Sequence, residues 1–361
     1  MSDFHGSYLP HQVTFLLQPI TLEPMTDLAE KERLIQSGRR HYSEMLSPEP
    51  APSEAYLRLF QAACGQNLPR MAAGCLQLAA QIAAGRENPV LVSLARAGTP
   101  PGVALQHILS RHYGREVPHY SISIIRDRGI DQNALRHILR RHDAAQLVFV
   151  DGWTGKGVIK RELDKFLAAF NRQNNCSLPS DLYVLSDLAG VTPYAASRDD
   201  YLIPSAILNA CISGLVSRSV LNEKIGANDF HGCVYLEDLA AHDLSRRFIA
   251  ELTAVSGRLQ QNGLPAAQFS DPAPAAALSS RFIAHAARRY GISDINLIKP
   301  GIGEATRVML RRRPRLLLLR DPASADVVHL LQLAEEKNTA VETDAALPYQ
   351  AAALIQDLRH A

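Results

Sequence analysis

Glycines and charged residues follow an apolar run in the segment LVFVDGWTGKGVIKREL, residues 147–163. The run ends in Asp151, glycines surround Trp153 and Lys156, and an amphipathic helix pattern comes directly afterwards. The first amides of a helix carry partial positive charge, which favours an anion such as phosphate. The segment therefore predicts a phosphate-binding loop.

Two common nucleotide motifs do not fit this loop. If Gly155 and Lys156 ended a Walker A motif, Val150 would replace its first glycine and Gly157 its magnesium-binding hydroxyl. The glycines are also spaced G-x-x-G-x-G, whereas a dinucleotide fingerprint requires G-x-G-x-x-G. We therefore interpret the loop from the elements that position it.

Short apolar runs alternate with helical patterns through the first two thirds of the chain. The expected strands cover residues 89–95, 118–125, 145–151 and 181–187. This alternation predicts an α/β fold with a mainly parallel sheet and helices on both faces. In such sheets ligands bind at the carboxyl ends of the strands. Those ends read ARAGTP, RDRGID, DGWTGKG and DLAG.

Length and composition limit the class of protein. The chain has 361 residues, which suggests two domains, and its net charge of +2 does not by itself indicate a nucleic-acid partner. No signal peptide or membrane span is evident, and the five cysteines form no C-x-x-C pair. We expect a cytoplasmic protein with reduced thiols, without a membrane partner and forming a homo-oligomer.

The strand ends together offer what a ribose 5-phosphate bearing a 1-diphosphate requires. Asp151 can accept hydrogen bonds from ribose hydroxyls or from a magnesium-bound water, and Thr154 lies in the phosphate loop. Arg96 adds charge to a loop of small residues, where the backbone can approach a diphosphate. Arg126 and Arg128 can neutralise a leaving group, or can pair with the Asp127 between them.

Residues 89–190 resemble a type I phosphoribosyltransferase, with VLVSLARAG similar to its pyrophosphate loop and LVFVDGWTGKG similar to its phosphoribosyl-diphosphate motif. Together with LIQSGRRHYSEML, IRDRGID, DYLIPSAILNACISGLVSRS and KPGIGEATRVMLRR, they resemble a bacterial family associated with tellurium-resistance gene clusters. That family joins a phosphoribosyltransferase to a Pelota-type RNA-binding domain. The resemblance implies transfer of phosphoribosyl from 5-phosphoribosyl 1-diphosphate to an unidentified base-like acceptor, with Mg²⁺ as cofactor.

The resemblance also implies roles for individual residues. The expected catalytic residues are Asp151, which also holds the magnesium ion, Arg126 and Arg128. The expected acceptor pocket consists of Asp187, Leu188 and Ala189. The residues expected to bind phosphoribosyl diphosphate are Ala95, Arg96, Ala97, Gly98, Gly152, Trp153, Thr154, Gly155, Lys156 and Gly157.

Two alternatives remain open for this domain. The usual phosphoribosyl motif has two adjacent acids, and Gly152 replaces the second, so a non-catalytic ligand sensor that binds RNA is the competing function. Members of the family are also labelled cysteine proteases. Cys211 lies in an apolar run and is expected to be a core thiol, while Cys233 and His231 point to opposite faces if they lie on a strand. These positions disfavour a protease.

A Pro/Ala-rich interval separates a C-terminal unit. We expect an N-terminal extension over 1–67, a phosphoribosyltransferase-like domain over 68–262, a linker over 263–278 and a Pelota-like domain over 279–361. The segment IKPGIGEATRVMLRR resembles the RNA-inserting loop of kink-turn-binding proteins, although Gly303 replaces the base-reading asparagine. RNA binding and docking onto the first domain are the competing uses. The expected RNA-binding residues are Lys299, Gly301, Gly303, Glu304, Arg307 and Arg311.

Overall fold

The computed structural model describes residues 4–357 and contains a seven-stranded main sheet. Six strands lie in the order β1-β4-β3-β6-β7-β8 with all neighbours parallel, and β5 pairs antiparallel with β4. The mainly parallel α/β fold is therefore confirmed. The strands are β1 (Thr14–Leu16), β3 (Val90–Ala95), β4 (His119–Ile125), β5 (Gly129–Ile130), β6 (Leu147–Thr154), β7 (Leu182–Asp187) and β8 (Ala195–Ser197).

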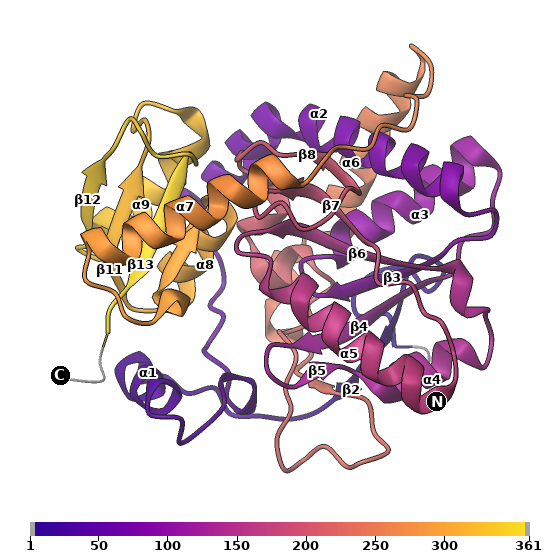
Figure 1. Ribbon diagram of the computed structural model, residues 1–361, viewed down its shortest axis with the longest axis horizontal. Helices are drawn as coiled ribbons and strands as arrows, with labels where there is room; N and C mark the ends of the chain where they lie inside the picture. The colour runs from indigo at the N-terminus through magenta and orange to yellow at the C-terminus, as the bar shows by residue number, and fades with distance from the viewer. Residues whose placement is uncertain (1–3, 358–361) are drawn as a thin grey trace.

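Helices cover both faces of this sheet (Figure 1). One face packs against α2 (Glu54–Gly85), α3 (Thr99–Tyr113) and α6 (Ser245–Gln260). The other packs against α4 (Gln132–Leu139) and α5 (Val158–Asn174). The central strands are buried on both faces, as their continuous runs of apolar residues predict.

Local sequence signals explain where several of these helices begin and end. Asp131 caps α4 by accepting a hydrogen bond from the amide of Ala134, and Gly157 adopts a positive φ of 68° before the first residue of α5. The apolar spacing of LPRMAAGCLQLAAQIAA, residues 68–84, predicts a helix, and this helix is part of the longer α2, which continues through Pro69. The N-terminal half of α2 was not predicted, because residues 57–67, LRLFQAACGQN, have a weaker apolar periodicity than residues 68–84.

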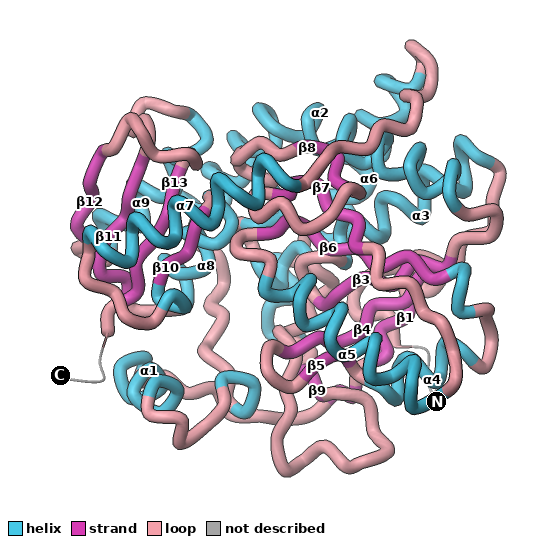
Figure 2. Tube along the Cα trace, in the orientation of Figure 1, coloured by secondary structure: helices cyan, strands magenta, loops and turns pink. Residues whose placement is uncertain are grey.

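The C-terminal unit has its own four-stranded sheet, in the order β10-β13-β11-β12 (Figure 2). Two pairs are antiparallel, and β11 and β12 are parallel. A connection over 261–272 leads into α7, so the predicted linker of 263–278 includes the first residues of that helix. The elements are α7 (Ala273–Arg289), β10 (Ile298–Pro300), α8 (Ile302–Arg311), β11 (Pro314–Leu319), α9 (Val328–Glu336), β12 (Ala340–Thr343) and β13 (Ala351–Ile355).

The two units share one hydrophobic core. A continuous cluster of buried side chains extends from α2 and α6 through Leu188 and Tyr201 to α8 and β13. The N-terminal segment also contacts the C-terminal unit, because Glu32 on α1 (Leu28–Gln36) forms an ion pair of 2.6 Å with Arg312. The short strands β2 (Gln18–Pro19) and β9 (Gly232–Cys233) form a separate parallel pair.

The four predicted strands are confirmed, each starting within two residues of its expected position. Small polar residues recur at every fourth position from Ser205 to Ser217, which predicts one stripe along a helix, and this prediction is wrong. This segment forms two short 3-10 helices, Pro204–Ala206 and Asn209–Ile212, and Gly214 and Leu215 then adopt positive φ angles. A regular helix cannot contain such residues. No helix in the described chain is long and apolar enough to span a bilayer.

Candidate functional site

The carboxyl ends of β3 and β6 face the C-terminal unit, and three adjoining cavities lie between them. Their volumes are about 490 Å³ (cavity A), 200 Å³ (cavity B) and 260 Å³ (cavity C). Tyr42 and Arg307 line all three. The cavities therefore form one junction site to which both units contribute.

The predicted phosphate loop is covered by α8. The guanidinium of Arg307 lies 4.5 Å from the ring centroid of Trp153, and Gly303 packs so closely on the same ring that a Cβ would clash with it. A Cβ on Gly155 would lie 2.6 Å from Cγ of Glu304. The glycines of both units thus permit the close approach of loop and helix.

Glu304 places a half-buried carboxylate over this loop. It forms an ion pair of 2.7 Å with Arg307. Although burial opposes ionisation, Arg307 and Lys299 hold the pKa of Glu304 below its usual range. Burial and the neighbouring charge of Lys299 lower the pKa of Lys156 to about 7, and its ammonium donates to the carbonyl of Ile295.

Asp151 lines cavity C and is buried within β6, which extends three residues beyond it to Thr154. Its Oδ1 accepts a hydrogen bond of 2.7 Å from the amide of Gly152. Burial raises the pKa of Asp151 to about 6, although the charge of Arg307 partly offsets this. The carboxyl therefore exchanges its proton close to neutral pH.

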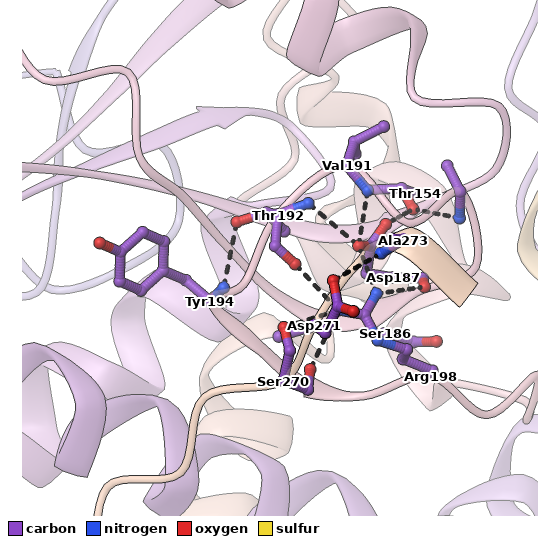
Figure 3. Close-up of polar contacts among 12 residues, drawn as sticks. Thr154, Ser186, Asp187, Val191, Thr192, Tyr194, Arg198, Ser270, Asp271 and Ala273 are labelled. Carbon is purple, nitrogen blue, oxygen red and sulfur yellow. Dashed lines mark hydrogen bonds and ion pairs between the residues drawn. The ribbon is translucent and has the colours of Figure 1, made fainter. Parts of the chain in front are cut away.

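Asp187, predicted to contact an acceptor, is fully buried within a hydrogen-bonded network (Figure 3). Its carboxylate forms an ion pair of 2.8 Å with Arg198 and accepts from the hydroxyl of Thr154 at 2.6 Å. The amides of Val191 and Thr192 donate to Oδ2. These contacts hold the loop after β7 against the end of β6.

The neighbouring residues of that loop also make protein contacts. The amide of Ala189 donates to Oγ1 of Thr154 at 3.1 Å, and Leu188 packs against Gly301, which begins α8 with a φ of 87°. The predicted acceptor pocket of Asp187, Leu188 and Ala189 therefore lies beneath the contact between the two units.

The loop after β3 lines cavity B with Ala95, Arg96 and Ala97. Arg96 is buried, forms an ion pair of 2.6 Å with Glu49 and donates to the carbonyl of Val216 at 2.8 Å. The loop packs tightly on β6. A Cβ on Gly98 would clash with the carbonyl of Val150, and one on Gly152 would lie 3.1 Å from the carbonyl of Ala97.

The two arginines after β4 differ in position. Arg126 lines cavity C, and its guanidinium lies 5.5 Å from the ring centroid of Tyr42 and pairs with Asp127 at 3.1 Å. Arg128 forms a partly exposed ion pair of 3.0 Å with Glu44 and lines none of the three cavities.

The residues predicted to bind RNA face the main domain. Lys299 lines cavities A and C, and Arg311 lines cavities A and B and donates to Oδ1 of Asn209. Glu304, Arg307, Gly301 and Gly303 meet the loops described above. In this conformation the surface predicted for RNA forms the contact between the units.

The donor set does not fit the expected magnesium ion. Within residues 4–357, no three His, Cys, Asp or Glu side chains are grouped to hold a metal. Asp151 provides a single carboxylate, one oxygen of which already accepts from Gly152. Magnesium usually takes one or two carboxylates together with ligand phosphates, so we derive no step through this ion.

The cysteines differ in their access to the site. Cys64, Cys75 and Cys233 are buried, and burial raises the pKa of each thiol to about 12. Cys176 is half-buried and donates to Asn171. Cys211 lines cavity A; burial, followed by the charges of Glu49 and Asp243, raises its pKa to about 11, while Arg96 opposes the shift.

Sequence reasoning missed several residues of the junction site. Tyr42, Glu49, Asn209 and Arg218 all line it. Tyr42, Asn209 and Arg218 lie in segments that carry the family resemblance, but no role was expected for any of them. Glu49 lies in the segment SPEPAPS, whose prolines indicate an extended chain and are the one local pattern that could have drawn attention to it. Nothing in the local sequence shows that this segment packs against the edge of the sheet.

Comparison with known proteins assigns both parts of the chain. Residues 6–253 match a family model described as tellurite-like stress resistance cysteine protease StiP, and residues 277–357 match a PELOTA RNA binding domain. A protein named cysteine protease StiP, from Acinetobacter baylyi, is 45% identical over 369 residues, covering 98% of this chain and 95% of that protein.

These matches confirm the expected link to tellurium and stress resistance and the Pelota domain. They overturn the predicted phosphoribosyltransferase function, including 5-phosphoribosyl 1-diphosphate and magnesium as its requirements, because both the family and the relative are named cysteine proteases. The glycine loops at the strand ends suggested phosphate binding because local sequence patterns do not reveal what the assembled site acts on. A solved structure of a C-DES mutant with glycine linked to its PLP cofactor is 11% identical in sequence and has a TM-score of 0.28. The match covers 91% of this chain and 89% of that one.

Proposed function

Because the chain belongs to the tellurite-like stress resistance cysteine protease StiP family, we propose that it is a thiol-dependent peptidase with Cys211 as its nucleophile. The observation that supports this choice is the position of Cys211 in the wall of cavity A, the largest of the three described. Cavity A lies at the junction of the two units, where an extended peptide can reach the thiol.

The chemistry requires ionisation of the thiol. A thiolate attacks the peptide carbonyl, the amine leaves with a proton and water then hydrolyses the thioester. Glu49 opposes ionisation of Cys211 and Arg96 favours it, and these two side chains form an ion pair. We propose that Arg96 stabilises the thiolate once a substrate draws Glu49 away.

The surroundings of the thiol differ from a preformed Cys–His pair. Within the described residues, no hydrogen bond joins a histidine ring to a cysteine thiol. A thiol whose pKa is about 11 is almost wholly protonated at pH 7. We therefore expect slow alkylation of Cys211 by iodoacetamide at pH 7 and faster alkylation as the pH rises toward 11.

Hydrolysis of fluorescently labelled casein tests the proposal. Cys211→Ala should abolish hydrolysis, whereas Cys176→Ala should retain it because Cys176 lies at the end of α5, outside all three cavities. Both variants should unfold cooperatively like the parent protein. Undiminished hydrolysis by Cys211→Ala would exclude this nucleophile.

RNA binding by the C-terminal unit is a second candidate function, supported by the match of residues 277–357 to an RNA-binding domain. Because Lys299, Arg307 and Arg311 face the main domain, RNA would bind another surface or would first separate the units. Mobility-shift titrations of the full chain at two salt concentrations test this function, because phosphate contacts weaken as salt rises.

We propose a type I phosphoribosyltransferase-like architecture for the main sheet, without that activity, and a Pelota-like architecture for the C-terminal unit. The parallel order β1-β4-β3-β6-β7 supports the first assignment, and the family match supports the second. An experimental structure with a different strand order would remove the first assignment.

A further inference from the structure

Cavity B is lined by polar groups that have no protein partner. Among the described residues, no hydrogen bond is made by Nε1 of Trp153, Oγ of Ser205, Oγ of Ser219, Nη1 of Arg218 or Nε of Arg311. All five side chains line the same cavity of about 200 Å³. Buried donors are normally satisfied, so this convergence indicates a ligand that accepts hydrogen bonds.

The charges of the cavity point to an anion. Arg96 and Arg307 are neutralised by Glu49 and Glu304, which lie within ion-pair distance. Within residues 4–357, Arg218 has no carboxylate partner and donates to the backbone carbonyls of two residues, Tyr42 and Met45.

Arg311 likewise lacks a carboxylate partner in the described chain and donates to the neutral side chain of Asn209. Burial, together with the charge of Arg96, lowers the pKa of Arg311 to about 9 and that of Arg218 to about 10, although the charge of Glu49 partly opposes both shifts. Half-buried cations that repel one another in this way are stabilised by a counter-ion.

We infer that cavity B binds a compact oxyanion group of a small ligand, held between Arg218 of the main domain and Arg311 of the C-terminal unit. Two guanidiniums without counter-ions match about two negative charges, as in a phosphate monoester at neutral pH or a pair of carboxylates. The planar forks of arginine suit both chemistries. The inference does not require the peptidase proposal, because Cys211 does not line cavity B, although Arg96, which is proposed to stabilise the thiolate, lines it.

The position of the site has a consequence for the whole molecule. Its two principal cations come from segments 93 residues apart, and one of them lies at the end of α8. A ligand that binds both therefore links the C-terminal unit to the main domain. Binding should raise the stability of the complete chain as ligand concentration rises.

Calorimetric titration with inorganic phosphate, and separately with succinate, tests the inference. We expect saturable binding of at least one anion, and the stronger of the two identifies the chemistry of the ligand. Trp153 is the only tryptophan and lines the cavity, so its fluorescence should change in the same titration. Chloride at matched ionic strength should leave both signals unchanged.

Variants locate the binding. Arg311→Gln should weaken it at least tenfold, whereas Arg313→Gln, on an exposed neighbour, should leave it unchanged. Arg218→Gln also removes contacts to the segment around Tyr42, so the paired change Ser205→Ala with Ser219→Ala is a second probe. Loss of two hydrogen bonds should weaken binding about tenfold. Absence of saturable binding to either anion, or unchanged binding by Arg311→Gln, would overturn the inference.

Discussion

Strands β6 and β7 lie side by side and both carry an aspartate, yet the two carboxylates have different surroundings. Asp187 on β7 forms an ion pair with Arg198 and accepts hydrogen bonds from three further donors. Within residues 4–357, Asp151 on β6 accepts a single hydrogen bond, from the adjacent Gly152, and lines cavity C.

This difference separates a structural carboxylate from one that is available to a ligand. Asp187 is neutralised and satisfied by the protein, so it holds the loop after β7 in place. Burial raises the pKa of Asp151 to about 6, and no cation forms an ion pair with it in the described chain. Groups that line a cavity and have a strongly shifted pKa are candidates for a functional role.

The comparison predicts that Asp187→Ala has the largest effect on stability. Removing this carboxylate leaves Arg198 without its partner, and breaking a buried ion pair costs about 3–5 kcal/mol. Urea unfolding measures the loss. Asp164→Ala is the matched control, since Asp164 forms a more exposed ion pair with Lys160 and should lose less than about 1 kcal/mol. Equal losses would show that the network around Asp187 is unimportant.

Asp151→Asn should have an effect of the opposite sign. The pKa of Asp151 is about 6 in the folded chain against an ordinary 3.8, so ionisation costs the folded state stability as the pH rises from about 4 to about 6. This cost reaches about 3 kcal/mol above pH 6. Asparagine cannot ionise, so the variant should be more stable by up to that amount at pH 7.5 and equally stable near pH 4.

Unfolding free energies of the two proteins measured from pH 4 to 8 check this expectation. A constant difference across the range would show that Asp151 does not titrate there. Unchanged stability at every pH would show that this aspartate is as well solvated as an exposed one, and the contrast with Asp187 would then disappear.

The strands and the sheet edge were predictable because they depend on local apolar runs and on a general property of parallel sheets. Asp151, Arg96 and Trp153 do line the junction cavities. The different environments of Asp151 and Asp187 were not predictable, because Arg198 and α8 reach them through tertiary contacts. The 3-10 segment around Asn209 was missed for the same reason.

Thr154→Val should give a smaller loss than Asp187→Ala. Thr154 lies on β6, and its hydroxyl donates to Asp187 and accepts from the amide of Ala189. Valine keeps the shape but removes both contacts, which should cost about 1.5–3 kcal/mol for a hydrogen bond to a charged group. Thr154→Ser retains the hydroxyl and should recover most of that stability in urea unfolding. Equal loss in both variants would attribute the effect to packing of the methyl group.

The smallest effect is expected at Gly303, where α8 meets Trp153 at the end of β6. An added methyl group would clash with the indole, and overpacking typically costs about 1–3 kcal/mol. Alanine is also favoured over glycine in a helix by about 1 kcal/mol, so the net loss for Gly303→Ala should be about 1 kcal/mol. Fluorescence of Trp153 separates the cost of the clash from the gain in helix propensity, because only displacement of the ring changes its emission. Gly257→Ala in α6, where nothing lies within 4 Å of the added Cβ, should show the helix gain alone. If Gly303→Ala gains as much as Gly257→Ala with unchanged emission, α8 does not press on the end of β6 in solution.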